Sequence, residues 1–255
     1  MKLTQVSSTD IYVSSIGLGT VKFGRNQGVK YPNSFSLPTD KEISNLLSLA
    51  KDLNINLLDT APAYGNSEER LGKLLFNRND WVICTKVGEN FSNGLSSFDF
   101  SKKGIQASIE NSLKKINSDY LDIVLIHSNG DDEKIISSTD AFETLTKLKE
   151  QGLIKAIGMS TKTIKGSNLA LKYSDVVMLT YNPIETSEKN NIDIAHQINK
   201  SIFVKKAFAS GHLNKISNTN PIETSLDFIN QQDGVTSIIV GTINKNHLRE
   251  ISELI

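Results

Sequence analysis

Four side chains able to hold or move a proton stand at or just beyond the ends of three apolar segments. Asp59 ends the first segment, and Tyr64 follows it in a stretch broken by proline and glycine. Lys86 and His127 each end a run rich in β-branched residues. Apolar runs bounded by turn residues predict buried strands. If the three strands are parallel, their carboxyl ends meet at one face, and the four side chains converge there.

A charged neighbour would change what Tyr64 can do. A free tyrosine has a pKa of about 10 and is a poor acid–base group near neutrality, but a nearby ammonium favours the phenolate and lowers that pKa. Lys86 can supply the charge, and Asp59 can offset the penalty for burying the lysine. His127 can hydrogen-bond a carbonyl oxygen. The set therefore predicts general acid/base chemistry at Tyr64, such as proton transfer to or from a carbonyl oxygen.

Each of these residues also has a plainer explanation. Taken singly, Asp59 could cap a turn and Tyr64 could be half-buried packing. His127 could bind a metal, but no second histidine stands at ligand spacing, because the others are scattered over predicted helices and a loop. Those others are His196, His212 and His247. A zinc-dependent barrel hydrolase is therefore disfavoured.

Eight apolar segments alternate with eight amphipathic ones along the chain. The expected strands cover 14–18, 55–59, 81–86, 121–127, 156–159, 176–180, 202–206 and 237–240. The expected helices cover 39–53, 66–75, 105–116, 142–152, 169–172 and 192–198, one that begins at 221, and 245–254. Parallel strands that are buried on both faces produce such runs. The pattern predicts an α/β fold, a (β/α)8 TIM barrel with an N-terminal β-hairpin over 2–13, as a single domain spanning 1–255. Its active site is expected at the carboxyl ends of the strands.

The glycines after the first core strand do not complete a dinucleotide-binding fingerprint. Gly17, Gly19 and Gly24 show part of its spacing, but that motif must run straight into a helix. A long loop through Tyr31 and Pro38 is expected here instead. The Rossmann interpretation is therefore rejected.

The order Asp, Tyr, Lys, His resembles the catalytic tetrad of the aldo-keto reductases. The matching phrases are Gly17-Leu18-Gly19-Thr20, Asp59-Thr60-Ala61 with Tyr64-Gly65, Thr85-Lys86, and Leu125-Ile126-His127. The resemblance covers nearly the whole chain. It implies that Asp59, Tyr64, Lys86 and His127 are catalytic, and that the cofactor is NADP(H), the family's usual choice, with NAD(H) possible.

The same resemblance implies a cofactor site. Ser160 matches a serine that contacts the nicotinamide carboxamide, while Thr161 and Met178 replace the usual asparagine and glutamine. Lys206 stands where many members have an aromatic or arginine residue, and 207–213 would pass the pyrophosphate. The residues implied are Gly19, Thr20, Ser160, Thr161, Lys206, Ala207, Ser210, Gly211, Thr242, Asn244, His247 and Glu250.

The adenosine end of that site departs from the family pattern. Thr242 and Asn244 could take phosphate or adenine contacts near a helix N-terminus, where anions are favoured. Gly241 and His247 replace two basic residues that often grip the 2′-phosphate, and Ile251 replaces an asparagine that often contacts the adenine. The choice between NADP and NAD is therefore left open.

Composition excludes several other classes of function. The chain has 255 residues and no formal net charge at pH 7, which gives no sign of nucleic acid or of an anionic membrane as a partner. No signal peptide or membrane-spanning run is apparent. The single cysteine, Cys84, excludes an intrachain disulfide, which fits a reducing, cytoplasmic location. The expected partner is a small-molecule carbonyl or alcohol substrate, and the oligomeric state is left open.

Two other functions compete with a reductase. One is a nucleotide-sensing regulatory subunit of the same fold with little turnover, which the altered cofactor site allows. The other is a barrel isomerase or lyase without a cofactor. For the reductase, the substrate is expected to depend on loops 23–38, 88–100 and 128–138. The chain ends soon after the last predicted helix, which favours an open pocket for a polar, sugar-like substrate.

Overall fold

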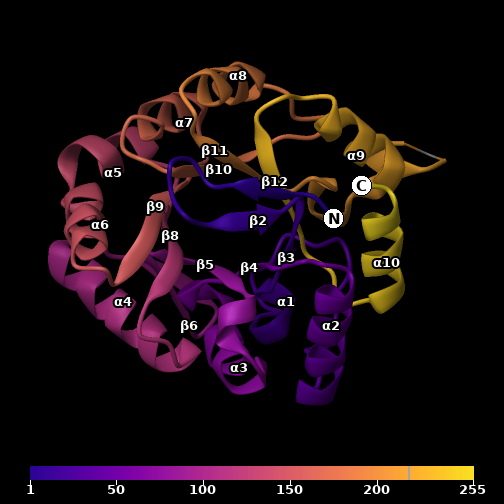
Figure 1. Cartoon of the computed structure of the whole chain (residues 1–255), viewed down its shortest axis with the longest axis horizontal. Coiled ribbons are helices and arrows are strands. Elements are labelled where there is room, and N and C mark those ends of the chain that lie inside the picture. Colours follow the sequence, from indigo (N-terminus) through magenta and orange to yellow (C-terminus); the bar gives the residue numbers. More distant parts are fainter. Residues whose placement is uncertain (218) are drawn as a thin grey trace.

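A computed structural model describes residues 1–217 and 219–255. In the described part of the chain, eight parallel strands close into a barrel that is ringed by helices (Figure 1). The barrel strands are β3 (Ile16–Gly19), β4 (Leu57–Asp59), β5 (Val82–Val87), β8 (Leu121–His127), β9 (Ile154–Ser160), β10 (Val176–Thr180), β11 (Ser201–Lys205) and β12 (Val235–Val240). They pair in that order, and β12 pairs back onto β3. The predicted (β/α)8 barrel is confirmed.

The helices follow the strands in alternation. They are α1 (Val21–Gly24), α2 (Asp40–Asp52), α3 (Ser67–Leu74), α4 (Lys102–Ile116), α5 (Asp132–Ser138), α6 (Ala141–Glu150), α7 (Ile164–Ala170), α8 (Lys189–Gln197), α9 (Pro221–Asn230) and α10 (Lys245–Glu253). Short 3-10 turns are η1 (Pro62–Tyr64), η2 (Arg78–Asp80), η3 (Ala209–Gly211) and η4 (Leu213–Lys215). None of the helices described here is long and apolar enough to cross a bilayer.

The start of α2 shows how local sequence sets these elements. Thr39 accepts a hydrogen bond from the Glu42 backbone N–H at 3.3 Å, and the Glu42 carboxylate accepts one from the Thr39 N–H at 2.7 Å. This reciprocal capping box satisfies two N–H groups that would otherwise lack partners. The apolar stripe of the helix, including Ile43, Leu46 and Ala50, is buried against the barrel. The helix predicted from 39 is confirmed.

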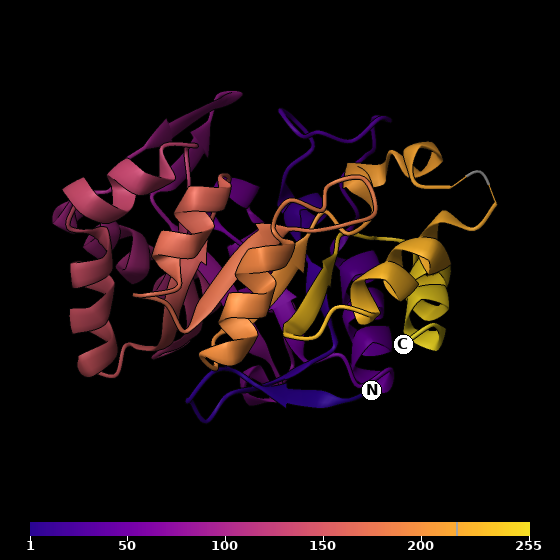
Figure 2. The same cartoon turned by 90° about the horizontal axis from the view of Figure 1, so that it is seen from above.

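The N-terminal hairpin closes one end of the barrel. Strands β1 (Leu3–Gln5) and β2 (Tyr12–Ser14) pair antiparallel, as predicted. Val6, Ile11 and Val13 are buried in the same apolar cluster as the side chains inside the barrel. Figure 2 shows the hairpin at one end and the loops that follow the strands at the other. Any site formed by the strand ends therefore opens opposite to the hairpin.

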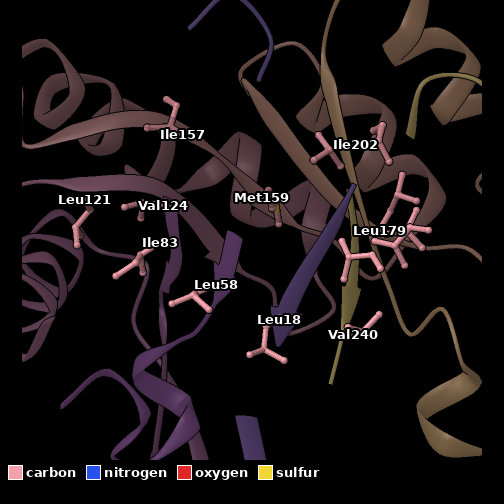
Figure 3. Packing of buried hydrophobic residues seen from close by; sticks show 14 of the residues in the cluster. Leu18, Leu58, Ile83, Leu121, Val124, Ile157, Met159, Leu179, Ile202 and Val240 are labelled. Carbon is pink, nitrogen blue, oxygen red and sulfur yellow. The ribbon is translucent and has the colours of Figure 1, made fainter. Parts of the chain in front are cut away.

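Alternation along the strands determines which side chains face the barrel interior. Leu57 and Leu125 belong to the cluster inside the barrel, whereas Leu58 belongs to the larger layer between strands and helices (Figure 3). Successive strand residues point to opposite faces. Asp59 and His127, two positions after Leu57 and Leu125, therefore point inward at the mouth.

Three predicted loops contain regular structure. Residues 88–100 form a hairpin of β6 (Glu89–Ser92) and β7 (Leu95–Phe98), joined by Asn93 and Gly94, which have φ of 52° and 81°. Asn-Gly favours such a two-residue turn because both positions need positive φ, so the loop prediction was wrong. Helix α5 lies within 128–138, and the four-residue α1 interrupts the loop expected after β3.

Candidate active site

The barrel mouth brings Asp59, Tyr64, Lys86 and His127 together. Asp59 and His127 end β4 and β8, Lys86 lies on β5, and Tyr64 ends η1. Lys86 Nζ donates to Asp59 Oδ1 at 2.5 Å, and the Tyr64 hydroxyl lies 3.5 Å from Asp59 Oδ2. The rings of Tyr64 and His127 meet edge to face, with centroids 6.2 Å apart. The convergence predicted from the strand ends is therefore present in the structure.

The ion pair between Lys86 and Asp59 is almost completely buried. Their side chains are 1% and 5% exposed, and Lys86 Nζ also donates to the Thr60 carbonyl at 2.8 Å. Burial acts to lower the pKa of Lys86, but the negative charge of Asp59 and its hydrogen bond outweigh burial and raise it. Lys86 is therefore charged near neutral pH, with Nζ 4.8 Å from the centroid of the Tyr64 ring.

Burial has the largest effect on the pKa of the Tyr64 phenol. Burial raises the pKa of Tyr64 above its usual value, the charge of Asp59 adds to this, and Lys86 opposes both. The expectation that Lys86 makes this phenol acidic is therefore wrong for the chain without a ligand. The hydroxyl is protonated near neutral pH, which is the form that can donate a proton.

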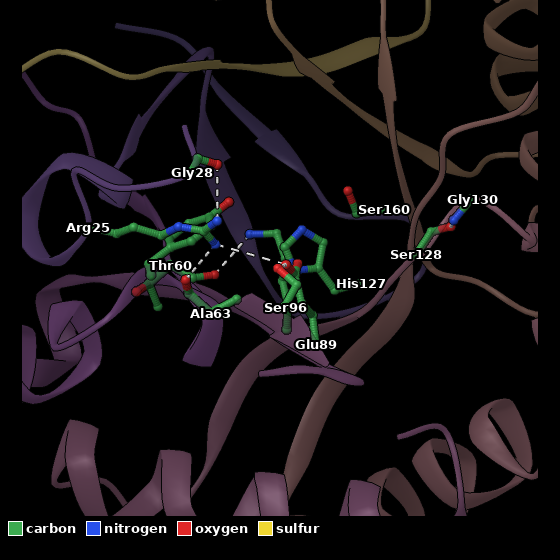
Figure 4. Close-up of polar contacts among 12 residues, drawn as sticks. Arg25, Gly28, Thr60, Ala63, Glu89, Ser96, His127, Ser128, Gly130 and Ser160 are labelled. Atoms are coloured by element: carbon green, nitrogen blue, oxygen red, sulfur yellow. Dashed lines mark hydrogen bonds and ion pairs between the residues drawn. The ribbon is translucent and has the colours of Figure 1, made fainter. Parts of the chain in front are cut away.

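Glu89 is a charged group at the mouth that sequence reasoning missed. Its Oε2 lies 2.8 Å from His127 Nδ1, at ion-pair distance rather than as an aligned hydrogen bond. Arg25 Nη1 approaches the same carboxylate at 3.9 Å and donates to the Ala63 carbonyl at 3.0 Å (Figure 4). Burial acts to raise the pKa of Glu89, but contacts with His127, Ser96 and Arg25 outweigh it and hold the pKa at about 2.

Charged neighbours of His127 have opposing effects on the pKa of its imidazole. Burial lowers the pKa of this imidazole, the charges of Lys86 and Lys205 lower it further, and Glu89 raises it, with a net lowering. Because an ionised carboxylate only accepts hydrogen bonds, Glu89 favours a proton on Nδ1. We assign that tautomer from the contact. His127 can then donate from Nε2 only when it carries both protons.

The residues implied for the nicotinamide end occupy different environments. Ser160 ends β9 directly beside His127 in the strand register. Thr161 is buried, and its Oγ1 lies 2.7 Å from Ser167 Oγ on α7, so it points away from the mouth. Met178 belongs to the apolar cluster inside the barrel. Of these three, Ser160 is the one placed to contact a ligand.

Lys205, rather than Lys206, faces the mouth from β11. Lys205 Nζ donates to Ser160 Oγ at 2.8 Å and to the Thr161 carbonyl at 2.6 Å. Lys206 follows the strand, is exposed and has a φ of 55°. The predicted strand covers 202–206, and the family resemblance placed Lys206 in the cofactor site, whereas the observed strand ends at Lys205. The three apolar residues that precede the two lysines conceal the alternation. Phe203, in the cluster inside the barrel, identifies Lys205 as the inward residue.

The remaining cofactor candidates lie along the rim. Thr20 is buried and donates to the Asp59 carbonyl at 2.9 Å, which makes it part of the scaffold. Ala207 is buried after β11, while Ser210 and Gly211 lie in η3 with φ of 57° and 90°. A Cβ placed on Gly19 would lie 3.5 Å from the Cα of Gly241. The backbones of these two glycines therefore lie close together at the mouth.

At the adenosine end, the candidate side chains act as caps. Thr242 Oγ1 accepts from the Asn244 N–H at 3.1 Å, and Asn244 Oδ1 accepts from the Asn246 N–H at 2.8 Å at the start of α10. His247 and Glu250 are exposed on α10. The contacts give Thr242 and Asn244 a structural role at the helix N-terminus, and the predicted cofactor roles of all four residues stay predictions.

A loop crosses the rim above these segments. A Cβ placed on Gly241 would lie 2.9 Å from the Tyr31 hydroxyl, and one on Gly211 would lie 3.2 Å from Cδ of Pro32. Lys22 Nζ lies 4.1 Å from the centroid of the Tyr31 ring. The chain between α1 and α2 therefore covers this edge of the mouth, and its first part also contacts the β6–β7 hairpin, where the Arg25 guanidinium lies 3.4 Å from the centroid of the Phe91 ring.

The donor chemistry of the mouth fits a nicotinamide cofactor. Ser160 Oγ and Lys205 Nζ lie beside His127, and an ammonium has three N–H donors, of which Lys205 uses two. One donor is therefore left for a ligand.

A closed parallel barrel whose mouth holds this tetrad defines a class of oxidoreductase. Residues 15–224 match the model of the Aldo/keto reductase family, and the chain belongs to that family. Its members interconvert carbonyls and alcohols and use nicotinamide cofactors, so the protein is an enzyme of the oxidoreductase class.

Individual relatives agree with this assignment. A crystal structure of a Pseudomonas aeruginosa protein, described as a candidate aldo-keto reductase, has a TM-score of 0.90 and 44% identity, over 99% of this chain and 93% of that chain. An oxidoreductase of uncharacterised activity from Bacillus subtilis is 25% identical over 98% of this chain and 90% of its own length. D-threo-aldose 1-dehydrogenase from a Pseudomonas species is 28% identical, over 68% of this chain and 60% of that enzyme. The chain thus spans less than two thirds of the aldose dehydrogenase.

Proposed function

We propose that the protein interconverts an aldehyde, ketone or sugar and the corresponding alcohol by hydride exchange with NAD(P)(H), with Tyr64 as the general acid/base. The observation that carries this proposal is the contact of the Tyr64 hydroxyl with the buried Lys86–Asp59 pair, with His127 beside it. Proton transfer needs a protonated donor within hydrogen-bond reach of the carbonyl oxygen.

Each residue of the tetrad then has a distinct task. Tyr64 donates its proton to the carbonyl oxygen during reduction, and accepts one from the alcohol during oxidation. Lys86 stabilises the phenolate that remains, and Asp59 keeps Lys86 charged and in place. His127 orients the carbonyl by a hydrogen bond from Nε2. The bound nicotinamide supplies or takes up the hydride.

The polar surroundings of the mouth favour a hydroxylated substrate. Arg25 and Glu89 are each only 11% exposed in their side chains, and Glu89 contacts both Arg25 and His127. Taking such charged groups further out of water against an apolar ligand would cost free energy. The likeness to an aldose dehydrogenase supports a sugar or another small polar carbonyl compound.

Cofactor preference is proposed as NADP(H), with NAD(H) as the alternative. NADP(H) is the family's usual cofactor. The alternative is supported by Gly241, which offers no side chain to a 2′-phosphate, and by the replacement of a second basic residue by His247, which is exposed on α10. Titrating the protein with NADPH and with NADH decides between the two, since a tenfold difference in Kd corresponds to ~1.4 kcal/mol.

A screen of carbonyl compounds tests the activity. Purified protein is mixed with NADPH or NADH and a panel of aldoses, short aldehydes and ketones, and loss of the reduced cofactor is followed by absorbance. We expect turnover with at least one polar carbonyl compound. Tight cofactor binding with no turnover across the panel would instead favour a nucleotide-sensing subunit, and absence of binding would refute both.

The contact between Glu89 and His127 predicts a pH effect. Because Glu89 raises the pKa of His127 against burial, Glu89→Gln should lower that pKa further. The alkaline limb of kcat/KM for carbonyl reduction, where His127 loses its second proton, should move to lower pH, because less His127 carries both protons at a given pH. NMR titration of the histidine ring signals measures the pKa directly.

Glu133→Gln, which removes an exposed carboxylate from α5, is the control. An unchanged His127 pKa in Glu89→Gln would contradict this role.

A further inference from the structure

Lys205 holds an uncommon position for a lysine. It is the last residue of β11, and its side chain reaches past β10 to Ser160 and to the Thr161 carbonyl on the far side. Among residues 1–217 and 219–255, no carboxylate forms an ion pair with it. Burial, with Lys206 and Lys86 nearby, lowers the pKa of Lys205 to about 7.

A partly buried ammonium without a carboxylate partner costs free energy in the folded protein. Burying a charged amine without a carboxylate is unfavourable, and Asp132, the nearest acidic influence, is already bonded to Thr163 and Ser128. Two neutral oxygen acceptors hold Lys205, and one N–H remains. Lys205 Nζ donates to Ser160 Oγ, and Ser160 pairs with His127 in the strand register and lies near the His127 ring (Figure 4).

The chemistry of the mouth limits what can occupy that side. Hydride and proton go to the two ends of one carbonyl bond, so the nicotinamide ring must lie within reach of Tyr64 and His127. The ring carries a carboxamide, whose oxygen needs a donor once water is excluded. The side chains near Ser160 offer few alternatives, because Thr161 bonds to α7 and Met178 has no polar hydrogen.

We propose that Lys205 is a cofactor-positioning residue: together with Ser160 it hydrogen-bonds the carboxamide of the nicotinamide and fixes the plane of the ring at the barrel mouth. This inference rests on the proposed function, because it requires a nicotinamide cofactor. A hydrogen bond from a charged donor is stronger than one between neutral groups. The same positive charge repels the oxidised ring, which is a cation, so it favours binding of the reduced form.

Binding measurements separate a contact to the nicotinamide from a structural role. The full-length protein and its Lys205→Met variant are titrated calorimetrically with the reduced cofactor that the wild type prefers. They are also titrated with its oxidised form and with the ADP-ribose fragment, carrying the 2′-phosphate where needed, which lacks nicotinamide. Lys205→Met should weaken binding of the reduced cofactor about tenfold, ~1.4 kcal/mol. The oxidised form should lose less, and affinity for the fragment should be unchanged.

Matched variants complete the test. Lys162→Met removes an exposed cation that also acts on Lys205, and it should change none of the three affinities. Lys205→Gln keeps a neutral donor for Ser160, and it replaces Lys205→Met if the latter does not fold, with the same expected order of losses. Circular dichroism and thermal unfolding verify that each variant is folded.

Several results would overturn the inference. Equal losses for the cofactor and the fragment would mean that Lys205 acts through the scaffold or through general charge. The inference would also be wrong if Lys205→Met bound the reduced cofactor as tightly as the wild type. It would be wrong as well if affinity fell in Lys206→Met but not in Lys205→Met. If the wild type bound neither NADPH nor NADH, the proposed function would fail as well. If only the inference about Lys205 is wrong, the wild type still binds the cofactor.

Discussion

Replacing Tyr64 by phenylalanine is expected to lower kcat for carbonyl reduction by about 10²- to 10⁴-fold, the usual contribution of a positioned general acid. The substitution removes one oxygen atom and keeps the ring. The edge-to-face contact with His127 and the position under Lys86 Nζ should therefore persist. Steady-state kinetics with the best carbonyl substrate measures the loss, and calorimetric titration should show cofactor affinity largely unchanged.

A second tyrosine provides the control for this experiment. Tyr120 precedes β8 at the opposite end of the barrel, and its hydroxyl donates to Asn79 Oδ1 at 3.2 Å. Tyr120→Phe removes the same atom and should leave kcat as in the wild type. If Tyr64→Phe also turned over at the wild-type rate, Tyr64 would not be the proton donor and the proposed mechanism would be wrong.

Removing the charge of Asp59 should have the largest effect on stability. In Asp59→Asn the buried ammonium of Lys86 loses its counterion, and breaking a buried pair in this way costs about 3–5 kcal/mol. The pKa of Lys86 should fall, because burial then acts without the opposing charge. Chemical denaturation measures the change in the free energy of unfolding. The variant should also lose turnover, since Lys86 is no longer held beside Tyr64.

A double variant distinguishes the missing counterion from general damage. Asp59→Asn combined with Lys86→Met leaves no unpaired charge, so most of the lost stability should return while activity does not. Glu143→Gln breaks an exposed pair with Lys147 on α6, and it should leave the free energy of unfolding nearly unchanged. If the double variant were no more stable than Asp59→Asn, the buried charge would not explain the loss.

Local sequence signals determined the frame of this protein. The capping box at Thr39 placed the start of α2, and the run 176–180 coincides with β10. Alternation of apolar runs with amphipathic helices was enough to predict the barrel. Because the carboxyl ends of parallel strands share one face, the same pattern also placed Asp59, Lys86 and His127 together. These features depend on neighbours a few residues away, which is why the sequence alone reveals them.

Other features depended on contacts between distant segments. Asn93-Gly94 is a local hairpin signal that was overlooked, but nothing local says that the hairpin brings Glu89 to His127. The run Ile202-Phe203-Val204 is apolar on both faces, so only closure of the barrel shows that Lys205 points inward.

The protonation of the site was also decided by the tertiary structure. From the sequence, Lys86 next to Tyr64 implied an acidic phenol, whereas the folded chain buries the hydroxyl beside Asp59, and desolvation raises its pKa instead. Residue types and their order therefore determined which groups meet at the mouth. Burial, register and loop packing decided how those groups are charged and which lysine faces the ligand, because solvation is a property of the assembled barrel.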